Sequence, residues 1–214
     1  MKKVWFIIAF GIALRLLLIP FTIHPDIRGH YLGGYLIAKQ GQFFSLYDYI
    51  SRLPRDHVLA KLYGDDFLVY SPLTYWSHAL FINVLSPLYP PGLLEQFITH
   101  MDQAVKNPEM PRLLFLLKFP YLLLDLVILK LLWLVLGSKH RQATAFLWAF
   151  NLPLIYSAYL MGQFDIFIVL FILLAAWLAG INRPSLAAVA LAVSAGFKPF
   201  GLIMVPFLPG SKIK

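Results

Sequence analysis

The sequence predicts an all-α, polytopic membrane protein with about five transmembrane helices, and three properties support this fold class: composition, hydropathy and the length of the apolar segments. The chain has 214 residues, of which 60% are hydrophobic and 13% are charged, and its mean hydropathy is +0.73. A soluble domain usually has about 25% charged residues and about 45–50% apolar ones. So few charges could not cover a soluble globule of this size, whereas a bilayer favours apolar side chains on the outer face.

The first predicted transmembrane helix covers residues 4–21, inside an N-terminal segment of residues 1–22. A membrane-spanning helix needs about 20 mainly apolar residues, with a range of about 17–25. Lys2 and Lys3 precede this run as in a signal peptide, but no small-residue cleavage site follows and Arg15 interrupts the run. We therefore expect a retained membrane anchor and not a cleaved leader.

Residues 23–112 form a long polar segment, which we predict to be an extracytoplasmic loop carrying interfacial helices. It contains nearly all the acidic residues and most of the histidines. Residues 70–87 within it could form a sixth span, but His78 and Asn83 interrupt their apolar run and prolines flank it. A helix that lies in the membrane interface, or dips into it, fits this stretch better.

Residues 113–209 are predicted to contain four further transmembrane helices, at residues 113–136, 143–161, 164–180 and 186–208. The connections at residues 138–142 and 181–184 are short, so we expect the helices on either side of each connection to be antiparallel neighbours. The whole chain, residues 1–214, is then a single transmembrane module.

Basic residues in short connections predict the orientation, because Lys and Arg mark the cytoplasmic side. With five spans, the clusters at Lys2–Lys3, at Lys139–Arg141 and at Arg183 all lie in the cytoplasm. A sixth span would place the second cluster outside. We therefore expect a multi-pass protein of the cell membrane with a cytoplasmic N-terminus, and with the long loop and the turn at residues 162–165 on the outer face.

Composition also excludes several classes of site and partner. The chain has no cysteine, which excludes disulfides and thiolate metal sites. Its formal charge of +8 comes from basic residues scattered between apolar runs, and there is no basic helix or aromatic RNA-binding signature. We therefore expect contacts with membrane lipid and no binding of nucleic acid.

The run His24-Pro25-Asp26-Ile27-Arg28-Gly29-His30 follows the first predicted helix directly. Pro25 favours an extended conformation of His24, which should hold the Asp26 carboxylate near the membrane surface. A partly desolvated carboxylate there could act as a general base. The alternative is a helix cap, since Asp is common at helix boundaries.

Lys198 and the turn at residues 162–165 are the other candidate site residues. Lys198 is predicted to lie inside the last transmembrane helix, where a lysine costs about 2.5–3.5 kcal/mol, unless it snorkels to the interface. Next to Pro199, which should kink the helix, its charge suits a lipid-borne phosphate. In the turn, Asp165 either caps the following helix or faces the site together with Gln163.

Two further groups of polar residues have structural interpretations. Asp125 is deep in the second predicted helix, and we expect it to pair with Arg15 of the first, with Lys118 nearer the polar face. Asp65 and Asp66 could bind a divalent cation through carboxylate oxygens, or could simply be solvated, so the metal question stays open. Several tyrosines and tryptophans of the loop either stack on a sugar or form an interfacial aromatic belt.

Taken in order, these motifs resemble the integral-membrane glycosyltransferases of the GT-C superfamily, and in particular bacterial relatives of the GPI-anchor second mannosyltransferase. The likeness extends over essentially the whole chain. The matching runs are His24-Pro25-Asp26, residues 41–49, Tyr70-Ser71-Pro72-Leu73, Lys118-Phe119-Pro120 with Asp125, Asn151-Leu152-Pro153, Gly162-Gln163-Phe164-Asp165 and Phe197-Lys198-Pro199.

The resemblance implies transfer of a sugar, commonly mannose, from a polyprenyl-phosphate donor to a glycan or lipid acceptor, with inversion at the anomeric carbon. Asp26 would be the catalytic base. Lys198 and Arg28 would stabilise the phosphate, His24 or His30 would assist, and Gln163 and Asp165 would line the substrate pocket. This chemistry requires Asp26 and Lys198 to meet at one site.

Three alternatives to a complete enzyme stay open. Members of this superfamily usually continue with several more helices, so this chain is alternatively the catalytic module of a longer enzyme, or a non-catalytic subunit whose partner supplies further helices. A small transporter that uses Lys198, Asp125 and Arg15 is a further alternative, but the inverted repeats typical of transporters are absent from the sequence.

Overall fold

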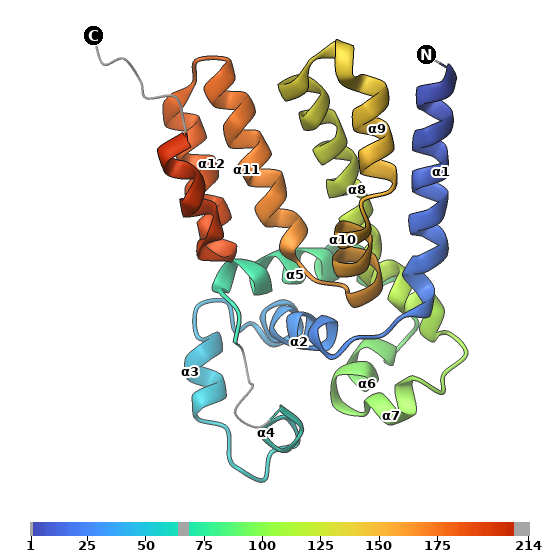
Figure 1. Cartoon of the computed structure of the whole chain (residues 1–214). Helices are drawn as coiled ribbons and strands as arrows, with labels where there is room; N and C mark the ends of the chain where they lie inside the picture. Colours follow the sequence, from blue (N-terminus) through green and yellow to red (C-terminus); the bar gives the residue numbers. More distant parts are fainter. Residues whose placement is uncertain (1, 64–68, 208–214) are drawn as a thin grey trace.

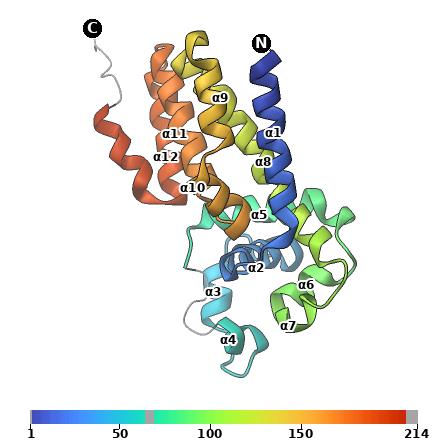
Figure 2. The ribbon, with the colours of Figure 1, turned by 45° about the vertical axis from the view of Figure 1, so that its right-hand side comes forward.

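The computed structural model describes residues 2–63 and 69–207, and these ranges contain helices but no β-strand. The all-α prediction is therefore confirmed for the described residues. Figure 1 shows two layers: α1, α8, α9, α11 and α12 stand side by side, and α2 to α7 form a second layer at one end of them. The N-terminus and the α8–α9 and α11–α12 connections lie at the opposite end of this bundle (Figures 1 and 2).

Within the described residues, two helical segments are long and apolar enough to cross a membrane. The first is α1 (Lys2–Leu18) with the 3-10 turn η1 (Ile19–Phe21), and the second is α8 (Met110–Leu136). A third span results if the bent pair at residues 138–149 and 152–161 counts as one. The helices α11 (Asp165–Gly180) and α12 (Pro184–Phe197) are apolar but shorter, with 16 and 14 residues.

The single helix predicted at residues 143–161 is wrong, because the chain bends by 43° within it. It begins with the 3-10 turn η4 (Ser138–His140) and α9 (Arg141–Ala149), and continues after the bend as α10 (Leu152–Leu154) and the π-helix η5 (Ile155–Met161). Asn151 causes the restart, since its side-chain oxygen accepts the Leu154 N–H at 3.1 Å. Pro153 follows in the first turn, where a missing N–H costs nothing.

The predicted helix at residues 186–208 is also wrong as a continuous element. The helix α12 ends at Phe197, Lys198 is extended with φ −150° and ψ 146°, and the 3-10 helix η6 (Pro199–Phe207) turns back beside α12 (Figure 1). Pro199 explains the break, because proline disfavours the α conformation in the preceding residue. Lys198 therefore stands at a helix end, and the cost of a lysine at a helix centre does not apply to it.

The second layer contains short helices formed by the predicted loop. The stretch at residues 70–87 forms α5 (Pro72–Leu85) and η3 (Ser86–Leu88), and α5 packs across α2 (Pro25–Gln40). Glycines allow this close crossing, since a Cβ on Gly33 would lie 2.1 Å from Cδ1 of Tyr75. The remaining helices of this layer are α3 (Leu46–Ser51), α4 (Val58–Tyr63), α6 (Leu93–Thr99) and α7 (Met101–Ala104).

The predicted ion pair between Arg15 and Asp125 is confirmed, and both side chains are fully buried. Arg15 Nε donates to Asp125 Oδ2 at 2.7 Å, while Trp148 Nε1 and the Tyr159 hydroxyl donate to the same carboxylate, each at 2.8 Å. Arg15 also donates to the carbonyls of Trp148 and Ala149 at 2.7 and 3.3 Å. This cluster joins α1, α8, α9 and η5.

Lys118 does not lie nearer a polar face as predicted, because its side chain is buried in α8. Its Nζ donates to backbone carbonyls at two helix ends. These are Ile19 and Thr22, at 3.3 and 2.6 Å, and Tyr159 and Leu160, at 3.0 and 3.2 Å. One cation therefore ties the end of η1 to the end of η5, and both of these ends lead into the candidate site.

Candidate functional site

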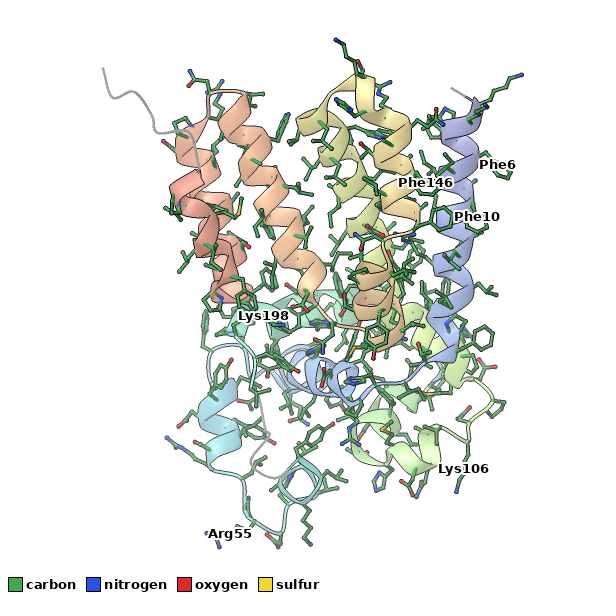
Figure 3. The ribbon with its side chains drawn as sticks, viewed as in Figure 1. Phe6, Phe10, Arg55, Lys106, Phe146 and Lys198 are labelled. Carbon is green, nitrogen blue, oxygen red and sulfur yellow. The ribbon has the colours of Figure 1, made fainter. Side chains whose placement is uncertain are left out.

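The candidate site lies where the bundle meets the second layer, at the starts of α2 and α11. Gln163 Nε2 donates to Asp26 Oδ2, which joins two segments 137 residues apart in sequence. Figure 3 labels Lys198, which lies at this junction, at the lower end of α12. The structure thus brings together Asp26, Gln163, Asp165 and Lys198 from three separate parts of the chain.

The conformation around Asp26 follows from the residues beside it. His24 is extended, as Pro25 predicts, with φ −128° and ψ 144°. The cap of α2 is His24 and not Asp26, since His24 Nδ1 accepts the Asp26 N–H at 3.3 Å. The Asp26 carboxylate lies 3.4 Å from His24 Nδ1 and is 29% exposed, so a substrate can reach it.

Asp165 and Lys198 form the second half of the site. Lys198 Nζ lies 2.5 Å from Asp165 Oδ1, and 4.8 Å from the centre of the Phe164 ring. Asp165 is the first residue of α11, but its N-cap is Phe164 and no side chain caps the helix. The carboxylate therefore pairs with Lys198 and does not serve as the cap. Both side chains keep partial exposure, at 40% and 28%.

Tyr70 connects the two halves, whereas the sequence suggested for this tyrosine only stacking on a sugar or a place in an interfacial aromatic belt. Burial, the nearby carboxylates of Asp26 and Asp165 and a hydrogen bond with Asp26 raise the pKa of Tyr70 to about 12. The hydroxyl thus stays protonated at neutral pH and can donate to Asp26. The only signal in the sequence was the position of Tyr70 in the Tyr-Ser-Pro-Leu run, which does not show that the chain returns to Asp26.

His30 is fully buried, and its ring lies against Tyr70 of the site. Its ring packs edge-on against Tyr70 and Phe164, with centroids 4.5 and 4.9 Å apart. Burial is the main cause that lowers the pKa of His30, followed by the charge of His78, so the imidazole is neutral at pH 7. His30 is thus a neutral supporting group behind Tyr70 and not a cation for phosphate.

Arg28 is not brought to Lys198. Its guanidinium lies 4.7 Å from the centre of the Tyr63 ring, and Nη1 is 3.6 Å from the sulfur of Met101. Asp26 and Arg28 are two residues apart on α2, and side chains at this spacing do not share a helix face. The expected contribution of Arg28 to phosphate binding therefore has no support in the structure.

An apolar groove of about 600 Å³ runs between α8, the broken α9–η5 segment and α11. Its lining is mainly apolar and includes Leu132, Leu136, Leu147 and Ile172. Asp165 of the candidate site belongs to the same lining. The groove thus connects the apolar interior of the bundle with the candidate site. No pattern in the sequence predicts this groove, because the groove depends on the bend after α9.

A metal centre has no support in the described residues, which contain no group of three or more His, Asp or Glu side chains suited to an ion. The pair Asp65 and Asp66, for which a divalent cation was considered, lies outside the described residues.

No family model matches the sequence, and no curated protein or solved structure is significantly similar to it.

Proposed function

We propose that this chain is a glycosyltransferase, or the catalytic module of one, that transfers a sugar such as mannose from a polyprenyl-phosphate donor to an acceptor hydroxyl. The observation that carries this proposal is the junction where Asp26 contacts Gln163 and Lys198 pairs with Asp165. A partly exposed carboxylate and an ammonium group at one site are the two groups that such a transfer needs.

In the proposed reaction, Asp26 removes the proton from the acceptor hydroxyl. The acceptor oxygen then attacks the anomeric carbon from the side opposite the phosphate, and the bond between that carbon and the phosphate oxygen breaks. The electron pair leaves with the polyprenyl phosphate, and the configuration of the sugar inverts. A positioned base contributes typically about 10²–10⁴-fold to the rate of such a step.

Lys198 would stabilise the negative charge of the leaving phosphate. An ammonium group is a compact point charge that suits phosphate oxygens. In the structure this charge is neutralised by Asp165, so an incoming donor phosphate would compete with Asp165 for Lys198. The apolar groove beside Asp165 is a suitable place for part of the polyprenyl chain.

The proposed site faces the extracytoplasmic side of the cell membrane. This placement assumes that the broken α9–η5 segment, α11 and α12 complete five spans with α1 and α8, and that the N-terminus is cytoplasmic. Its support is the position of the short basic segments. The start of α1, the α8–α9 connection and the α11–α12 connection, which carry Lys2, Lys139 and Arg183, lie at the end of the bundle opposite the site (Figure 1). Short connections rich in Lys and Arg are typical of the cytoplasmic side.

The direct test is sugar transfer by the purified protein in liposomes, with a radiolabelled polyprenyl-phosphate sugar and a lipid extract as acceptor. Asp26→Asn should lower the rate at least about 100-fold, because an amide cannot act as a base. Asp48→Asn is a matched control, since Asp48 is an exposed acid whose carboxylate pairs with Arg52, away from the candidate site. Both variants should insert into membranes in normal amounts.

Full activity of Asp26→Asn would contradict the proposal. Absence of transfer by the chain alone, with transfer once a partner protein is added, would favour the subunit interpretation instead.

A further inference from the structure

A second apolar groove, of about 410 Å³, lies between α1 and α8. Ile8 and Ile12 of α1 and Leu126 and Leu129 of α8 contribute to its apolar walls, and Trp5 and Trp133 contribute their rings. Lys130 and Arg141 belong to the same lining. Both cations are exposed. The α1 residues that line the groove lie between Trp5 and Ile12, in the half of α1 nearer the N-terminus, so the groove is away from the candidate glycosyltransferase site.

The charges around this groove are of one sign. The sequence has no Asp or Glu in residues 1–25, 126–164 or 166–214. Among the described residues, these ranges include the start of α1 and the α8–α9 and α11–α12 connections, which form this end of the bundle (Figure 1). In the described part of the chain, neither Lys130 nor Arg141 forms a salt bridge. The mouth of the groove is therefore cationic and lacks an internal counter-ion.

Hydrogen bonds and ring contacts hold the mouth in place. Trp133 Nε1 donates to the carbonyl of Arg141 at 3.3 Å, and the Arg141 guanidinium lies 5.8 Å from the centre of the Trp133 ring. Arg141 is the first residue of α9, whose N-cap has no side-chain hydrogen bond and whose first turn contains no acid. The Arg141 N–H itself donates to the Ser138 carbonyl, so the positive potential at the mouth comes from the Lys130 and Arg141 side chains.

We propose that this groove binds an anionic phospholipid, with the phosphate group at Lys130 and Arg141 and an acyl chain along the apolar walls. Charge complementarity selects the anionic headgroup, since basic pockets between membrane helices on the cytoplasmic side are typical sites for such lipids. Lys130 is six residues before the end of α8, about 9 Å along the helix axis. Its long side chain can extend from that depth to a headgroup while its methylenes cover apolar surface.

The test is native mass spectrometry of the full chain in a neutral detergent, titrated with phosphatidylglycerol or with phosphatidylcholine of the same acyl chains. We expect tighter binding of phosphatidylglycerol by at least about fivefold. Lys130→Gln and Arg141→Gln should each weaken that binding about fivefold, because a basic residue near an anionic lipid contributes about 1 kcal/mol. Binding of phosphatidylcholine should change little in either variant.

Arg183→Gln is the matched control, since Arg183 is an exposed cation that follows α11 at the same end of the bundle but does not line the groove. An equal loss in Arg183→Gln would overturn the proposal in favour of general charge attraction. Equal affinity for the two lipids would also overturn it, as would saturation by glycerol phosphate, which has the headgroup charge but no acyl chain. None of these outcomes depends on the proposed sugar transfer.

Discussion

At the scale of single residues, the buried ion pair of Arg15 and Asp125 joins the helices of the bundle. The Arg15 side chain pairs with Asp125 and also occupies the carbonyls of Trp148 and Ala149 at the end of α9. The last carbonyls of a helix have no partner within that helix. Arg15 therefore neutralises an acid and satisfies the helix end that the bend at Asn151 leaves open.

We predict that Asp125→Leu destabilises the protein by about 3–5 kcal/mol, since it leaves a buried arginine without its counter-ion. Arg15→Met combined with Asp125→Leu should cost less than the sum of the two single changes, because the two residues are in direct contact. Recovery should be incomplete, since the double variant still lacks the donors to α9. Thermal unfolding in detergent measures all three variants, and additive losses would show that the pair is not coupled.

At the scale of whole elements, helix ends determine where the site forms. Lys118 Nζ donates to carbonyls at the end of η1 and at the end of η5. The segments that follow these two ends carry Asp26 and Gln163, which contact each other. Proline and asparagine break the later helices, which produces the turn at Lys198 and the groove beside α11. The site therefore lies where helices stop, at a junction that continuous spans would not create.

Lys118→Met should loosen this junction while leaving α8 intact, because methionine keeps the length and the apolar stem of the side chain but loses its donors to four carbonyls. A disulfide between cysteines placed at 26 and 163 reports the contact, and the natural chain has no cysteine to interfere. We expect oxidation to close this bond at least about tenfold more slowly in the Lys118→Met background, if the lost contacts cost about 1.4 kcal/mol or more.

The exposed lysine Lys39, changed to Met in the same two-cysteine background, is the control. Equal rates of disulfide formation with Met at 118 and with Met at 39 would show that Lys118 does not hold the junction.

At the scale of the whole molecule, two layers share one polar junction. Buried histidines belong to this junction: His30 of α2 lies 5.3 Å from His78 of α5, measured between ring centroids. His78 Nε2 lies 2.8 Å from the Tyr121 hydroxyl of α8, which links the second layer to the bundle. The stability of this contact between the layers should therefore depend on the protonation of the histidines.

Burial lowers the pKa of His78 from 6.5 to about 4, and it also lowers the pKa of His30. The unfolded chain then binds more protons than the folded protein below about pH 6.5, so stability falls as the pH drops from about 6.5 towards 4. Each histidine contributes a slope of up to about 1.4 kcal/mol per pH unit. Between pH 7 and 5, the thermal midpoint of His78→Gln should therefore fall less steeply than that of the wild type. The midpoint of the control His140→Gln, which changes an exposed residue, should fall as in the wild type. Parallel pH profiles of wild type and His78→Gln would contradict this.

Local properties of the sequence determined the all-α class, the apolar first and second predicted helices, the extended His24 and the Arg15–Asp125 pair. Each of these features depends on a property that the sequence itself shows. These properties are the hydropathy of a segment, the effect of proline on the residue before it, and the need of a buried charge for a partner. The five-span arrangement and the sugar transfer stay proposals that rest on the same reading.

Only the tertiary structure decided the path of the chain after two local breaks, with η6 folded back beside α12 and a bend of 43° after α9. It also decided the direction of Arg28, the inclusion of Tyr70 and the apolar groove at Asp165. These features depend on contacts between segments far apart in sequence, as between Asp26 and Gln163. Hydropathy does not distinguish one straight span from two helices that fold back on each other, because the same apolar residues give the same hydropathy profile in both arrangements. The packing of the other helices selects between them.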